Sequence, residues 1–293
     1  MLFMQARPDV IILSLPQANV AGRIAARLVP RAVVVSFEHS IEYRRKLARL
    51  LMSMTAPLVD AVFYDHPESW RRLREAMPRL ALKDAHYVPL TAVDPVQAPA
   101  PIPQGRRHCV TTMRLDLGKN PFELFRAVRI LVDAGYDLDL TVAGDGPLRG
   151  ELERLAMDLG LWDRIHMRGF VERPSELLRS CDTYIMSSVR EGLSRSVIEA
   201  MASGLVVVST DVGAIREYGV DGENMIKSRG TSAADLAAAV ASALDMGSGA
   251  RRLQEGALRT VEKEFSAAVV RRHWGAALRA VEGLALKRVP AAD

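Results

Sequence analysis

Two glutamates, Glu191 and Glu199, bracket the predicted start of a helix in the stretch REGLSRSVIEAMASG. Ser194 is a suitable N-cap for this helix, and a glycine after small residues is a common helix stop. A helix N-terminus presents backbone N–H groups and partial positive charge, which favour a phosphate. A carboxylate on either side of a diphosphate would suit a nucleotide-sugar, one accepting hydrogen bonds from the sugar and the other from a ribose. Two alternatives stay open: Ser196-x-x-Glu199 also fits a capping box, and Glu191 also fits an acidic surface loop.

Positive charge follows the predicted strand HCVTTM. Arg114 and Lys119 lie in the loop TTMRLDLGKNP directly after it. Arginine can grip a diphosphate through two parallel hydrogen bonds, whereas lysine acts as a point charge. A later loop, VAGDGPLRGELERL, turns at Gly144 but lacks the G-x-G-x-x-G spacing, so a dinucleotide fingerprint is not supported. A plain strand-to-helix turn is the simpler interpretation of that loop.

Secondary-structure signals alternate along the whole chain. Short β-branched runs such as DVIILSL, AVVVSF, LDLTVAG and LVVVST alternate with helical patterns. Strands that are apolar on both faces and alternate with helices predict parallel sheets covered by helices. The proline-rich stretch VDPVQAPAPIPQG lacks periodicity and divides the pattern in two, as a linker would. Ligands of open parallel sheets bind beyond the carboxyl ends of the strands. The loops expected at that edge are 114–120, 144–147, 169–172, 187–194 and 210–213.

A family resemblance rests on four of these motifs. The E-x7-E pair, the GDGP turn, the RGFV strand end and the R-x4-K loop resemble the C-terminal domain of retaining glycosyltransferases of family 4, in order and spacing, over about residues 104–230. Residues 9–93 match the later half of the family's N-terminal domain more weakly. The resemblance implies an α/β, GT-B-like chain of two Rossmann-like parallel-sheet domains facing a cleft. It places a partial acceptor-side domain with linker at 1–103, a nucleotide-sugar-binding domain at 104–266, and a C-terminal helix at 267–293 that packs back toward the N-terminal domain.

The resemblance also implies roles for individual residues. In the family the first glutamate of the pair contacts the donor sugar and the second the ribose, and the histidine of EHS lies beside the sugar. Carried over, His39 and Glu191 are the expected catalytic residues. The residues around Arg168–Val171 are expected to line the base. The expected donor-binding residues are Arg114, Lys119, Gly144, Gly169, Phe170, Val171, Gly192, Leu193, Ser194, Arg195 and Glu199.

The implied function is that of a hexosyltransferase enzyme. It would transfer a sugar from a nucleotide-sugar to an acceptor glycan, lipid or small molecule with retention of configuration. No metal or other cofactor is expected, because the loop cations meet the diphosphate charge. Departures from the family pattern keep two alternatives open: no glycine-rich loop precedes the strand Val10–Leu15, and PLTAVD stands for the usual PNGVD. One alternative is a non-catalytic or partner-dependent GT-B subunit. The other is a sugar-nucleotide 2-epimerase, for which Glu38 and Asp65 are the candidate acids.

Charge and composition bear on location and partners. Residues 1–103 carry 13 Lys and Arg against 9 Asp and Glu, whereas the remainder balances 26 against 26. The excess gathers in YRRKLARLL and WRRLR, which predicts peripheral contact with an anionic membrane; a solvated helix face is the alternative. No signal peptide or membrane-spanning run is found, and the two cysteines form no C-x-x-C pair, which predicts a cytoplasmic chain at the inner membrane face. No nucleic-acid partner is expected. The strand Val10–Leu15 would leave one sheet edge open, which predicts self-association.

Overall fold

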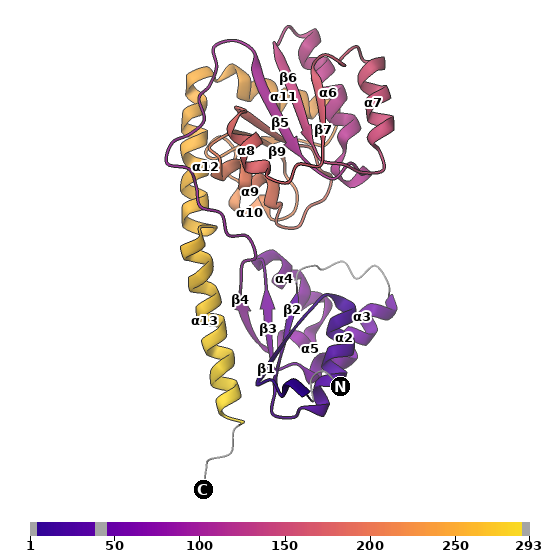
Figure 1. The fold of residues 1–293 in the computed structure, drawn as a ribbon, viewed down its shortest axis with the longest axis vertical. Helices are drawn as coiled ribbons and strands as arrows, with labels where there is room; N and C mark the ends of the chain where they lie inside the picture. The colour runs from indigo at the N-terminus through magenta and orange to yellow at the C-terminus, as the bar shows by residue number, and fades with distance from the viewer. Residues whose placement is uncertain (1–4, 39–45, 289–293) are drawn as a thin grey trace. The chain divides into compact units, whose positions relative to one another are not determined.

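The computed structural model describes residues 5–38 and 46–288 (Figure 1). Its contacts divide the chain into two compact units, Met1–Ala92 together with Ala267–Asp293, and Val93–Ser266. Each unit is a parallel sheet flanked by helices, so the α/β prediction is confirmed. The proline-rich stretch has no regular secondary structure and runs along the second unit, where Ala100 N donates to Gly204 O at 3.0 Å.

The first unit is built on a four-stranded sheet of order β1-β2-β3-β4. Its strands are all parallel, with β1 at one edge. The prediction of a strand beginning at Val10 is confirmed, whereas self-association through its edge stays a prediction. The elements of this unit are β1 (Val10–Ser14), α2 (Pro16–Ala25), η1 (Ala26–Leu28), β2 (Val33–Glu38), α3 (Lys46–Thr55), η2 (Ala56–Leu58), β3 (Ala61–Tyr64), α4 (Pro67–Ala76), α5 (Pro78–Ala81), β4 (Asp84–Tyr87) and α13 (Ala267–Leu286).

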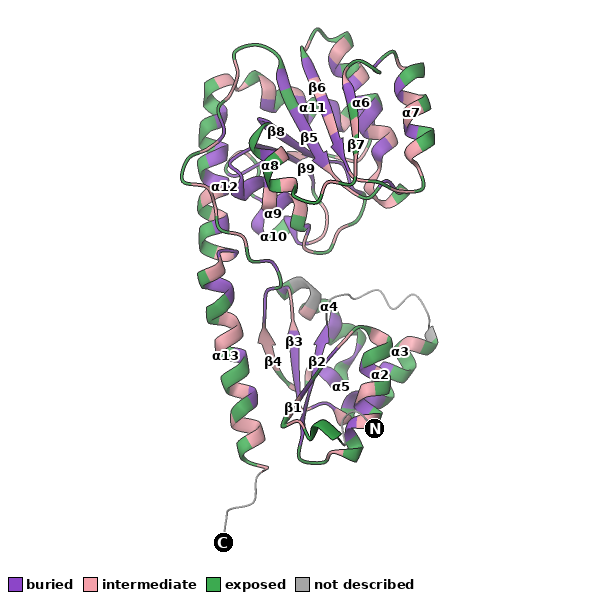
Figure 2. Cartoon of the chain, in the orientation of Figure 1, coloured by how far each residue is buried: buried purple, intermediate pink, exposed green. Residues whose placement is uncertain are grey.

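Side chains of β2 explain how this sheet is covered on both faces. Val33, Val35 and Phe37 pack with Ala277 and Val281 of α13. Successive strand side chains point to opposite faces. The alternate strand residues therefore point to the other face of the sheet, where they pack against the layer that contains α2, α3, α4 and α5 (Figure 2).

The second unit is built on a six-stranded parallel sheet of order β10-β9-β8-β5-β6-β7. From β5 the chain first moves outward to β6 and β7, and then returns to the other side of β5 for β8, β9 and β10. The neighbours β5 and β8 therefore mark the point where the strand order reverses. The elements are β5 (Arg107–Thr112), η3 (Leu117–Lys119), α6 (Pro121–Asp133), β6 (Leu138–Ala143), α7 (Arg149–Asp158), β7 (Ile165–Gly169), α8 (Pro174–Arg179), β8 (Thr183–Met186), α9 (Arg195–Ala202), β9 (Val206–Thr210), α10 (Ile215–Tyr218), β10 (Ile226–Ser228), α11 (Ala233–Asp245), η4 (Gly247–Ala250) and α12 (Arg251–Glu264).

The central strands of this sheet are buried on both faces. Val206 and Val208 of β9 join the core that α6 and α11 cover, and Val207 joins the core that α9 and α12 cover. This burial explains why the strand reads as an uninterrupted apolar run in the sequence. A sheet buried in this way holds the strand ends firmly, and the loops that follow them carry the candidate site.

Candidate active site

The loops after β5 and β8 meet where the strand order reverses. Asp116 shapes the first loop, because its carboxylate accepts hydrogen bonds from Gly118 N at 2.9 Å and Lys119 N at 3.3 Å. The two loops are then joined by Val189 N donating to Gly118 O at 3.0 Å and Ser187 Oγ donating to Lys119 O at 2.8 Å. The backbone of Lys119 is thus fixed to the loop after β8.

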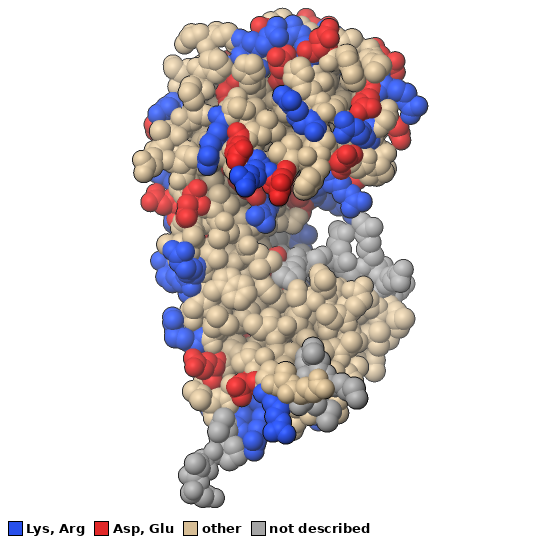
Figure 3. Space-filling model, viewed as in Figure 1, with Lys and Arg blue, Asp and Glu red and all other residues tan. Residues whose placement is uncertain are grey.

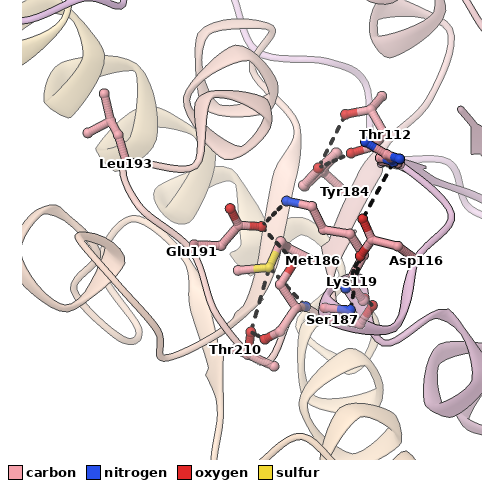
Figure 4. A network of polar contacts seen from close by, with 12 residues as sticks. Thr112, Asp116, Lys119, Tyr184, Met186, Ser187, Glu191, Leu193 and Thr210 are labelled. Atoms are coloured by element: carbon pink, nitrogen blue, oxygen red, sulfur yellow. Dashed lines mark hydrogen bonds and ion pairs between the residues drawn. The ribbon is translucent and has the colours of Figure 1, made fainter. Parts of the chain in front are cut away.

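An ion pair joins these loops across the switch point (Figure 4). Lys119 Nζ lies 2.7 Å from Glu191 Oε1, and Ser188 Oγ donates to the same oxygen at 2.6 Å. The glutamate side chain is only 9% exposed, and that of the lysine is 29% exposed. The structure therefore brings together a predicted catalytic carboxylate and a predicted diphosphate cation, which excludes the alternative that Glu191 is merely an acid of an exposed surface loop.

Two buried tyrosines, Tyr184 and Tyr218, form hydrogen bonds with residues of this region. Tyr218 donates to Leu193 O at 3.0 Å, and Tyr184 lies 3.3 Å from Thr112 Oγ1. Burial raises the pKa of both phenols, and the negative charge of Glu191 raises each pKa further. Both therefore stay protonated near neutral pH, so Tyr218 remains a donor that positions the backbone of the loop.

The helix entrance matches the predicted position but differs in its cap. Helix α9 begins at Arg195 with Ser194 as N-cap, which confirms the predicted start. Ser194 has a left-handed backbone (φ 54°), and its buried hydroxyl makes no capping hydrogen bond. Ser196 lies inside the helix and Glu199 accepts a hydrogen bond from Arg195 Nε at 2.8 Å, so the capping-box alternative is wrong. Gly192 O accepts from Ala214 N at 3.0 Å, which ties the entrance to the loop after β9.

A cavity of about 360 Å³ lies at the carboxyl edge of β5, β6 and β7. Five of the predicted donor-binding residues line it, from four separate segments of the chain: Arg114, Gly144, Phe170, Val171 and Glu199. Thr112, Met113, Ala143, Asp145 and Pro174 complete the lining. Lys119 and Glu191 are not among the lining residues. The sequence-predicted set therefore falls into a cavity group and an ion-pair group, with Gly192 to Arg195 in the segment between Glu191 and Glu199.

Gly144 lets two loops approach closely at this cavity. Its φ is +146°, its N–H donates to Gly169 O at 2.7 Å, and a Cβ there would lie 1.7 Å from Met113 O. Only glycine fits such a position. The loop is more constrained than a plain strand-to-helix turn would require, and it brings the end of β7, with the exposed Phe170, to the cavity.

Some predicted residues are not placed in a contact network. His39 lies outside the described residues. Arg114 lines the cavity but is mostly exposed, with its Nε 3.8 Å from Asp116 Oδ2. Sequence reasoning missed Asp116 and Ser188, which hold Lys119 and Glu191 in place. Their only signal was their position, beside predicted residues in loops that follow strands.

The chain contains two Rossmann-like parallel-sheet units, and the site lies at the switch point of the second. This is the architecture of GT-B glycosyltransferases. The chain belongs to the family of glycosyl transferases group 1, whose model matches residues 95–260.

Curated relatives match a limited part of the chain. It is 38% identical over 98 residues to an N-acetylgalactosamine-N,N'-diacetylbacillosaminyl-diphospho-undecaprenol 4-alpha-N-acetylgalactosaminyltransferase of Campylobacter jejuni, covering 33% of this chain and 26% of the relative. It is 39% identical over 93 residues to a 2-deoxystreptamine glucosyltransferase of Streptomyces kanamyceticus, covering 31% and 24%. The matched part thus spans about a quarter of each relative's length.

Solved structures match nearly the whole chain at low identity. Anabaena Alr3699/HepE in complex with UDP superposes with a TM-score of 0.82 and 19% identity, covering 95% of this chain and 81% of that one. Sucrose-phosphate synthase from Thermosynechococcus elongatus gives a TM-score of 0.78 and 18% identity, covering 96% and 76%. At such identity the likeness establishes the fold.

Proposed function

We propose that this chain is a glycosyltransferase that moves a sugar from a nucleotide-sugar to an acceptor glycan, lipid or small molecule with retention of configuration. The observation that carries the proposal is the pairing of Lys119 with Glu191 beside a cavity that gathers Arg114 and Glu199 at the carboxyl edge of one sheet. Family membership supports the same reaction class.

The donor-side roles follow from charge. Arg114 and Lys119 would meet the negative charge of the diphosphate, together with the N-terminal turn of α9. This charge grows on the leaving diphosphate as the glycosidic bond breaks, so fixed cations stabilise the transition state more than the bound donor. In this proposal the diphosphate needs no metal ion, because side chains and backbone supply the positive charge.

The two glutamates would each contact a different part of the donor. Glu199 lines the cavity and would accept hydrogen bonds from the ribose. Gly169, Phe170 and Val171 would border the base, with Phe170 offering an exposed ring for stacking. Glu191 would contact the sugar, and the acceptor would attack the face that the diphosphate leaves. His39 stays a predicted catalytic residue beside the sugar.

Calorimetry with UDP, GDP and ADP tests the donor side. UDP is the first choice, because the similar HepE structures hold UDP, UDP with glucose, or UDP-glucose. We expect micromolar binding of one nucleoside diphosphate, roughly −8 kcal/mol. Arg114→Met should weaken it, whereas Arg173→Met, a mostly exposed arginine outside the cavity lining, should not. No heat with any of the three nucleotides would refute the proposed donor site.

Turnover tests the enzyme itself. With the nucleotide identified, release of free nucleoside diphosphate from its sugar conjugates measures transfer, either to water or to an added acceptor. We expect slow release that Glu191→Gln reduces. Tight donor binding with no release under any acceptor condition would instead favour the non-catalytic or partner-dependent subunit.

A further inference from the structure

An apolar stripe runs along the exposed side of α3. Leu47, Leu50, Leu51 and Met54 are 66%, 56%, 39% and 62% exposed, and we call these four residues the α3 stripe. Their spacing of i, i+3, i+4 and i+7 places them on one side of the helix. Another side of α3 buries Met52 completely in the core of the first unit. The helix is therefore anchored by one side while it presents leucine and methionine outward.

The helix beside α3 also exposes apolar side chains. Ile24 and Leu28, on α2 and η1, are both exposed. Arg23, itself fully buried, donates from Nη1 to Met52 O at 3.1 Å and to Thr55 Oγ1 at 3.2 Å, which fixes α2 against α3. Apolar side chains are thus exposed on both members of a rigidly joined helix pair. Single exposed leucines are ordinary, but four exposed apolar side chains on one side of a helix mark an interaction surface.

The charge of this helix pair has one sign. The segments α2, η1 and α3 contain no Asp or Glu, and their exposed cations include Arg27 and Arg49. The acidic Glu42 and the basic Arg44 and Arg45 precede α3 in the sequence; all three lie outside the described residues. Figure 3 shows that most of the first unit's surface in view is uncharged away from α13 and the lower end, whereas the second unit mixes both signs. The partner that fits this pair is apolar and anionic.

An anionic membrane combines those two properties. A second copy of the chain would bring the same positive charge to a symmetric contact, which would oppose pairing. No helix among the described residues is long and apolar enough to cross a bilayer. A helix with an apolar side and cations can instead lie in the interface of the bilayer. We propose that the α3 stripe inserts at the boundary between headgroups and acyl chains of an anionic membrane. This proposal goes beyond sugar transfer and does not depend on it.

Vesicle flotation tests the proposal with a matched pair of variants. Leu50→Gln with Met54→Gln removes half of the stripe, and both side chains are exposed, so the fold should survive. Leu82→Gln is the control, because Leu82 is 86% exposed in the same unit but outside the helix pair. Parent and control should bind phosphatidylcholine vesicles that contain phosphatidylglycerol, and the double variant should bind at least roughly tenfold more weakly. At high salt all three should bind less, with the double variant still weakest.

Several outcomes would overturn the proposal. Equal binding by the double variant and the parent would mean that cations alone, or another surface, mediate contact. Absence of parent binding to anionic vesicles would also refute it. A concentration-dependent dimer in sedimentation that the double substitution abolishes would assign the stripe to self-association. Calorimetry with UDP in the absence of vesicles keeps the proposals separate, because the donor groups lie in the other unit: lost UDP binding with intact flotation refutes only the donor site.

Discussion

Glu199 offers a test of the ribose contact at the scale of one atom. Arg195 Nε donates a hydrogen bond to the Glu199 carboxylate. Because the arginine is exposed, this ion pair contributes little to stability. Glu199→Gln keeps one acceptor oxygen but loses the charge. If the carboxylate binds a ribose, calorimetry should show nucleoside diphosphate affinity reduced by about 1.5–3 kcal/mol. Because the capping box is absent, the melting temperature should stay nearly unchanged, and a large fall would assign the residue a structural role.

Glu191→Gln should give the opposite pattern. The substitution weakens the pairing with Lys119, whose half-buried ammonium then turns more fully toward any bound diphosphate. Binding of the free nucleoside diphosphate should therefore be unchanged or slightly tighter, while the nucleotide-sugar binds less well or turns over more slowly. Calorimetry with both ligands measures the difference. If this variant and Glu199→Gln bind both ligands like the parent, the two carboxylates do not bracket a donor.

The site could be predicted where its residues follow strands directly. Arg114 and Lys119 follow β5, and Gly144 follows β6, so position along the chain was enough to place them at one edge. The partnership of Lys119 with Glu191 could not be predicted, because it depends on β5 and β8 being neighbours in the sheet. Sequence order gives the strands but not their order across the sheet.

At the scale of elements, Gly213 in the loop after β9 lies directly against the backbone of Glu191. Gly213 has φ +58°, and a Cβ there would lie 2.3 Å from Glu191 O. Gly213→Ala should therefore cost about 1–2 kcal/mol of unfolding free energy for the left-handed backbone, and it should also displace the glutamate. We expect denaturant unfolding to show the loss and calorimetry to show weaker nucleotide-sugar binding.

Gly160 provides the matched control for that substitution. It has φ +62°, but a Cβ there would meet nothing within 4 Å. Gly160→Ala should lose only the unfolding free energy that the left-handed backbone costs, about 1–2 kcal/mol, with donor binding intact. If both alanine variants bind the donor equally well, the close approach of Gly213 to Glu191 has no part in shaping the site.

A long helix was predictable from its periodicity, whereas three of the shortest elements were not. The apolar periodicity after Pro121 predicts a helix from Pro121 to Ala134, and the structure has α6 over Pro121–Asp133, thirteen residues that complete several helical turns. The elements α5, α10 and β10 span only three or four residues each and were not predicted. A segment that short cannot complete a hydrophobic period, so its structure is set by the tertiary contacts around it.

At the scale of the whole molecule, the chemistry is unevenly distributed. The family match at residues 95–260 lies within the second unit, as do all the described donor-side residues of the proposal. The first unit contributes the buried Glu38 and the exposed α3 stripe. This division explains why the sequence predicted donor chemistry in more detail than it did the acceptor.

The division also predicts how a nucleotide should stabilise the chain. A ligand that binds the folded second unit and not its unfolded form adds about 2.7 kcal/mol at a hundredfold excess over its Kd. Hydrogen exchange followed by mass spectrometry should therefore show slower exchange in peptides from 93–266 when UDP is added, strongest around β5, β8 and α9. Peptides from the first unit, which hold none of the described donor-side residues, should exchange at the same rate with and without UDP.

The Arg114→Met variant should lose the protection while keeping the exchange pattern of the free protein. Equal protection of both units would show that the nucleotide acts on the chain as one cooperative body, and would contradict the assignment of the donor site to the second unit alone.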